Sequence, residues 1–119
     1  LTVEDCVDAH ICALENIKGK GCQVYIVSAP TPFSREEAPE LVNDAAGLVA
    51  KYYPKVTEIY EKAGWILPEF LDRIYDSSKI QQELGCKFST TFETVLAALQ
   101  TGEELPFHHD PSYVSPKET

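Results

Sequence analysis

The pattern of apolar and polar positions predicts helices that alternate with short extended segments. Apolar residues recur every three or four positions, which places them on one face of a helix, in the stretches 4–18, 35–52, 54–63, 77–84 and 91–101. Residues 22–28, Cys-Gln-Val-Tyr-Ile-Val-Ser, are mostly β-branched and aromatic and alternate too little for a half-exposed strand. We therefore expect residues 22–28 to form a central strand, buried on both faces.

Two of the predicted helices begin at sequences typical of a capping box. Ser34 and Glu37 have the required spacing before the helix at 35–52, and Thr90 and Glu93 have it before the last helix. In such a box each side chain bonds the backbone N–H of the other residue. We therefore expect each box to mark the start of a helix.

The stretch from Leu71 to Phe88 combines a strand, a cap, a short helix and a stop. Ile74 and Tyr75 have strand character, and Asp76 is a good N-cap for a helix of two turns. Gly85 then stands where a left-handed residue ends a helix. A helix this short is not stable alone, so we expect it to pack against a larger element.

Together with a strand end at residues 1–3, these elements predict an α/β fold with few strands and about five helices. Three strands make a poor sheet by themselves, so we expect the chain to be part of a larger α/β protein in which Leu1 is an internal residue. Residues 103–119 contain three prolines, two histidines and charges of both signs, and we predict a flexible tail there.

The composition excludes several classes of protein. The chain has 119 residues, 44% of them hydrophobic, and a net charge of −9, which disfavours nucleic-acid binding. It contains neither a signal peptide nor a run approaching the roughly 18 apolar residues of a membrane span, so we expect a cytoplasmic protein with no membrane partner. Its four cysteines form no Cys-x-x-Cys pair, and we expect reduced thiols.

Three segments resemble the C-terminal part of the extended short-chain dehydrogenases/reductases, the NAD(P)-dependent epimerase/dehydratase family. Residues 1–15 are similar to the family's Val-x-Asp-x-Ala-x-Ala-His-x-x-Ala-Leu-Glu, and residues 23–37 to its Tyr-Asn-Val-Gly-x-Gly-x-x-x-Ser-x-x-Glu. Residues 72–85 are similar to its Asp-x-Ser-Lys-x-x-x-x-Leu-Gly. The sequence departs from the family at residues 28–30, Ser-Ala-Pro, which replace a glycine-rich turn, and this leaves the substrate open.

The resemblance implies that residues 1–102 are the substrate-binding portion of a Rossmann-type oxidoreductase or isomerase. The parent enzyme would use NAD or NADP and a nucleotide sugar or related carbonyl compound, and the missing Rossmann half would carry the cofactor loop and the catalytic Tyr-x-x-x-Lys pair. We therefore expect no catalytic, cofactor-binding or metal-binding residues in this chain. The alternative is a stand-alone, non-catalytic binding or self-association module, and a homodimer stays open.

We predict Arg73 and Tyr75 as substrate-binding residues. The planar guanidinium of an arginine suits phosphate or carboxylate, and late arginines of the family often contact substrate phosphates, although an ion pair of Arg73 with Asp72 or Glu83 is an equal alternative. Tyr75 and Lys79 match the catalytic Tyr-x-x-x-Lys pair, but the expected N-cap at Asp76 places Tyr75 outside the helix. We therefore favour a packed tyrosine and a solvated lysine over a catalytic pair.

His10 follows Cys6 at i+4, but a zinc site needs a third ligand, so we favour a histidine that packs on its helix.

Overall fold

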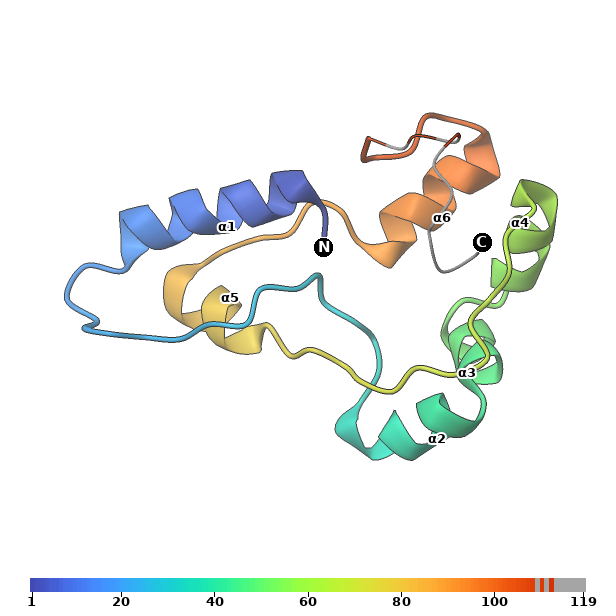
Figure 1. Ribbon diagram of the computed structural model, residues 1–119, viewed down its shortest axis with the longest axis horizontal. Coiled ribbons are helices and arrows are strands. Elements are labelled where there is room, and N and C mark those ends of the chain that lie inside the picture. Colours follow the sequence, from blue (N-terminus) through green and yellow to red (C-terminus); the bar gives the residue numbers. More distant parts are fainter. Residues whose placement is uncertain (109, 111, 113–119) are drawn as a thin grey trace.

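The chain folds as a set of short helices joined by long irregular segments (Figure 1). The computed structural model describes residues 1–108, 110 and 112. These residues form six α-helices and one 3₁₀ helix, η1: α1 (Val3–Asn16), η1 (Arg35–Glu37), α2 (Ala38–Asn43), α3 (Ala45–Tyr52), α4 (Val56–Ala63), α5 (Ser78–Leu84) and α6 (Phe92–Thr101). In this part of the chain, no helix is both long and apolar enough to cross a membrane.

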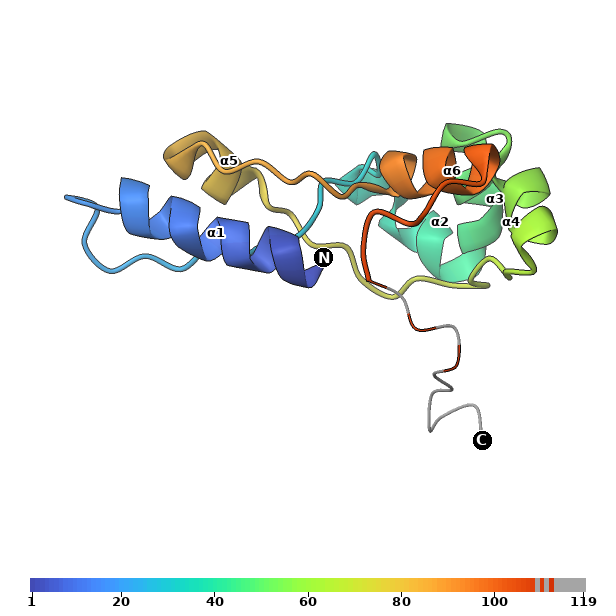
Figure 2. The ribbon, with the colours of Figure 1, turned by 90° about the horizontal axis from the view of Figure 1, so that it is seen from above.

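The helices pack in two groups, which both views separate (Figures 1 and 2). Helix α1 packs against α5, while α2 packs on α3, α3 on α4 and α4 on α6. The buried apolar residues accordingly fall into three small clusters rather than one core. Their members are Ala9, Ile80, Leu84 and Cys86 in the first group, and Val49, Val56, Ile59 and Leu96, with Leu41, Ala45 and Leu48, in the second.

The α/β prediction, a fragment of a Rossmann-type epimerase fold with few strands, is wrong, because residues 1–108, 110 and 112 contain no strand. Val3 begins α1, and residues 22–28 and 74–75 are irregular. A strand needs a neighbouring backbone that pairs with its N–H and C=O groups. Residues 22–28 instead meet side-chain partners: Lys79 Nζ donates to the Val24 carbonyl over 3.1 Å. The Val24 side chain, expected to be buried, is 81% exposed.

The single helix predicted over residues 35–52 is divided into η1, α2 and α3. The predicted capping box is present at its start, where the Glu37 carboxylate accepts the Ser34 N–H over 2.9 Å. The division between α2 and α3 occurs at Asp44, whose carboxylate accepts the Gly47 N–H over 2.9 Å and so caps α3. A side chain on Gly47 would collide with this carboxylate, which explains a glycine inside a helix.

The two ends of α5 agree with the sequence to within one residue. Gly85 has the left-handed conformation expected of it, with a φ of 69°. The N-cap is Ser77 rather than Asp76, but the Asp76 carboxylate still accepts the Ser78 N–H over 2.9 Å. Local signals therefore located this helix correctly.

A buried carboxylate joins α1 to the segment between α5 and α6. Asp5 is fully buried, and its carboxylate accepts the Ser89 N–H and hydroxyl, both over 2.9 Å, and the Thr90 N–H over 3.1 Å. The N-cap of α6 is Thr91, one residue after the predicted position, and its capping box forms with Thr94 instead of Glu93. We call this set of bonds the Asp5 clasp.

A disulfide forms a second link between the same segments. Cys12 in α1 is bonded to Cys86, two residues after α5, with 5.9 Å between their Cα atoms. The expectation of four reduced cysteines is therefore wrong for this pair, whereas Cys6 and Cys22 are free thiols. Nothing in the sequence spacing of the cysteines predicted which two would meet.

Part of the predicted tail is described. Leu105 and Phe107 are half-buried, whereas His108 is exposed. The rest of the predicted tail, His109, Pro111 and residues 113–119, lies outside the described residues.

We predict that Asp5→Ala lowers the free energy of unfolding by about 1–3 kcal/mol, because it removes the acceptor for three donors. Burial alone would raise the pKa of Asp5, but the bonds from Ser89 and Thr90 bring the pKa below its ordinary 3.8. The contribution should therefore be complete above pH ~4 and be lost as the pH falls through the lowered pKa. Urea titrations of the unmodified chain and of Asp5→Ala, at pH values between 3 and 7, measure this contribution. The exposed Asp8→Ala is the matched control, and an equal effect of both changes would contradict the clasp.

We also predict that the unfolded protein has two reactive thiols without a reductant and four after reduction. Counting alkylated cysteines by intact mass measures both numbers. The variant Cys12→Ser should lower the stability by roughly 2–5 kcal/mol, the usual cost of losing a native disulfide, whereas Cys22→Ser should leave it unchanged. Four reactive thiols before reduction would refute the bond.

Candidate functional site

A pocket of about 600 Å³ lies between two segments that are far apart in the sequence. One wall comes from residues 30–42, which include η1 and most of α2. The other wall comes from residues 71–78, which lead into α5, with Gln81 from α5 itself. Small-molecule sites typically enclose 300–1,000 Å³, so the pocket has the size of a ligand site.

Backbone hydrogen bonds hold the two walls together. The Leu71 N–H donates to the Leu41 carbonyl over 2.9 Å, and the Ala45 N–H donates to the Glu69 carbonyl over 3.2 Å. Leu71 and Ile74 also pack on the buried cluster of α2 and α3. The irregular segment before α5 is thus fixed on α2 by backbone bonds and apolar contacts.

Arg73, a predicted substrate-binding residue, lines this pocket. Its guanidinium donates two bonds to Asp72, from Nε over 3.2 Å and from Nη2 over 3.0 Å. The pKa of Arg73 is raised mainly by its hydrogen bond to Asp72, and next by the Tyr75 hydroxyl. Of the two ion pairs considered, only that with Asp72 forms, since Glu83 instead accepts the Tyr25 hydroxyl over 2.8 Å.

The Arg73–Asp72 pair is open to solvent, and this matters for what else can bind. The side chains are 66% and 61% exposed. Exposed ion pairs contribute little to stability, typically about 0–1 kcal/mol. A bound anion can therefore share or replace Asp72 as a partner of the guanidinium.

Tyr75, the other predicted residue, is exposed and also lines the pocket. It lies before α5, and Lys79 is directed elsewhere, toward the Val24 carbonyl and over the Tyr25 ring at 4.9 Å. Tyr75 and Lys79 therefore do not form the catalytic pair that their spacing imitates.

The sequence did not reveal Arg35 as a pocket residue. It lies on the opposite wall, at the start of η1, and no carboxylate of residues 1–108, 110 or 112 lies within ion-pair distance of it. Its only sequence signal was its place in the second segment that resembles the family. Nothing local showed that residues 30–42 would meet residues 71–78.

The lining carries charges of both signs beside an apolar surface. Arg35 and Arg73 supply guanidinium groups, and Asp72 and Asp76 supply carboxylates. Bonds from Arg73 lower the pKa of Asp72, and bonds from Ser78 lower that of Asp76, so both are ionised near neutral pH. This arrangement suits a ligand that has an anionic group and several hydroxyl groups.

None of the six glycines lines the pocket. The cradles that bind a dinucleotide carry glycines where the backbone approaches the pyrophosphate. The described part of the chain also contains no group of three metal-ligating residues. Cys6 Sγ lies 3.9 Å from His10 Nδ1, and the same nitrogen donates to the Cys6 carbonyl over 2.7 Å, as expected for a histidine that packs on its helix.

We compared the chain with models of protein families, with curated proteins and with solved structures, and none of the three comparisons found a match. The geometry of the pocket and the resemblance of three short segments are therefore the basis for a functional proposal.

Proposed function

We propose that the chain is the substrate-binding portion of an NAD(P)-dependent nucleotide-sugar epimerase/dehydratase or a related oxidoreductase. The observation that supports this proposal is the composition of the pocket. Two of the three segments that resemble the family, residues 23–37 and 72–85, contribute to opposite walls, and they bring Arg35, Arg73 and Tyr75 to one cavity.

In this proposal the two arginines bind the phosphates of the nucleotide sugar. A guanidinium donates two parallel hydrogen bonds to a phosphate, which fixes its orientation as well as its charge. Arg35 has no competing carboxylate in the described structure, and the partner of Arg73 is exposed and exchangeable. Arginines on facing walls can hold a diphosphate from two sides.

The carboxylates and the apolar wall would bind the sugar. Ionised Asp72 and Asp76 accept hydrogen bonds from hydroxyl groups, and Gln81 can both donate and accept. Phe33 supplies an apolar surface on the first wall. A simple anion would use only the arginines, so the mixed lining favours a glycosyl phosphate.

The chemistry of the reaction would lie outside this chain. The nicotinamide, when bound by a separate Rossmann portion, would supply the hydride transfer. The residues described here would bind and orient the substrate for it.

The alternative is a non-catalytic binding or self-association module. The observation that favours this alternative is exposed apolar surface, because Val24, Ile26 and Ile66 all face solvent. The module predicts a concentration-dependent dimer, which sedimentation equilibrium measures. It also predicts no affinity for nucleotide sugars.

We predict that the chain binds UDP-glucose and that Arg73→Ala weakens this binding about tenfold or more, because a charge-assisted bond to phosphate is lost. Arg35→Ala should have a similar effect, and Arg73→Lys an intermediate one, because lysine keeps the charge but loses the planar pair of donors. Isothermal titration calorimetry measures the affinities.

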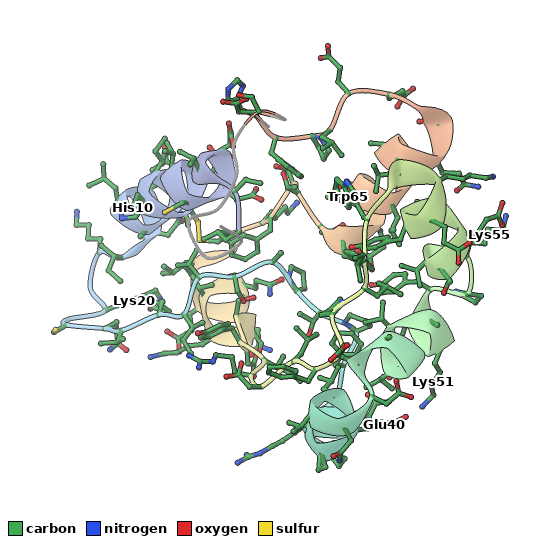
Figure 3. The ribbon with its side chains drawn as sticks, turned by 45° about the vertical axis from the view of Figure 1, so that its right-hand side comes forward. His10, Lys20, Glu40, Lys51, Lys55 and Trp65 are labelled. Carbon is green, nitrogen blue, oxygen red and sulfur yellow. A yellow bond between two sulfur atoms is a disulfide. The ribbon has the colours of Figure 1, made fainter. Side chains whose placement is uncertain are left out.

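The matched control is Lys20→Ala, which removes a cation on the loop after α1, away from α2 (Figure 3). It should leave the affinity unchanged. Equal weakening by Lys20→Ala would indicate attraction by net charge alone, and absence of binding at millimolar UDP-glucose would refute the proposal.

A further inference from the structure

Helix α1 has an apolar face that the described chain leaves uncovered. Val3, Val7, Ile11 and Leu14 are 76%, 51%, 49% and 80% exposed. At 100° per residue these four positions lie on one side of the helix. We call them the α1 stripe. The opposite side, which packs on α5 and its following segment, carries Asp5 and Ala9.

The α1 stripe has an acidic border. Glu4, Asp8 and Glu15 are exposed, and the helical repeat places all three along the same edge of the stripe. None of them forms an ion pair with a described residue. On the other edge lies His10, which is labelled on α1 in Figure 3.

The stripe continues into a hollow at the N-terminal end of α1. This hollow has a volume of about 430 Å³. Its apolar lining residues are Leu1, Val3, Val95 and Phe107, and its polar ones are Thr2, Glu4, Thr90, Thr91 and His108. The apolar residues suit a side chain inserted from outside. A row of exposed apolar side chains that ends in a hollow has the form of a surface that receives an amphipathic helix.

The exposed apolar area is as large as the largest patch of a typical soluble monomer. With Leu1, the stripe exposes on the order of 500 Å², within the range of roughly 300–600 Å² for such patches, which are often functional. Such patches mark interaction sites when polar residues border them, as the three acids do here.

We propose that the α1 stripe and the adjoining hollow bind a protein partner that presents an amphipathic helix bordered by lysine or arginine. The acidic border selects the charge of the partner. A second copy of this chain suits the surface poorly, because each copy carries a net charge of −9. The acidic border likewise opposes binding of nucleic acid or of an anionic lipid surface. The surface is separate from the pocket and does not depend on what the pocket binds.

The test uses two synthetic helical peptides with the same leucine pattern, one bordered by lysines and one by glutamates. Fluorescence anisotropy measures their binding to the whole chain at about 50 and 300 mM salt. We expect at least tenfold tighter binding of the lysine peptide, and weaker binding at the higher salt, because exposed charges are screened.

Three variants assign the binding to the surface. Val7→Asp should weaken binding of the lysine peptide at least tenfold, and the more exposed Leu14→Ser should also weaken it. Val24→Asp, which changes an exposed valine outside the α1 stripe, should leave it unchanged. Circular dichroism and urea titration establish that the variants fold.

A triple variant tests the border: Glu4→Gln, Asp8→Asn and Glu15→Gln together should abolish the preference for the lysine peptide. Absence of binding, equal affinity for both peptides, or equal loss with Val24→Asp would overturn the proposal. So would a dimer of the chain that Val7→Asp dissociates, because the stripe would then bind a second copy.

Discussion

The attachment of α1 to residues 84–90 is the interaction on which the arrangement of the whole chain depends. The Asp5 clasp and the Cys12–Cys86 disulfide both act there, one at each end of the contact. Without them α1 and α5 would share only a small apolar cluster. The clasp also fixes the residues just before α6, so it connects the two groups of helices that otherwise have separate clusters.

Several short clusters take the place of a single core, and this has consequences at the surface. Each cluster buries only a few side chains, so many apolar residues stay exposed, on α1 and in residues 22–28 above all. The pocket arises from the same arrangement, because the segment before α5 crosses α2 and is held there by backbone bonds. The pocket and the exposed apolar surface thus have a common origin in a fold with little interior.

Local features of the structure could be predicted from the sequence, and distant contacts could not. Gly85 and the Ser34 capping box depend on neighbouring residues alone, and both occur as predicted. The strand at residues 22–28 needed a pairing partner, which no local pattern can supply. Arg73 and Tyr75 were predicted as substrate-binding residues, and both line the pocket. Arg35 was not predicted, because its position depends on how two segments meet. The disulfide was missed for the same reason.

The position of the disulfide determines what survives a break in the chain. Residues 30–42 and 71–78, the two walls of the pocket, both lie between Cys12 and Cys86. A single proteolytic cut anywhere between these cysteines therefore leaves two fragments in one covalent molecule, each still attached to α1 or to the end of α5. Nicked protein keeps its mass, apart from one added water, until a reductant separates the pieces.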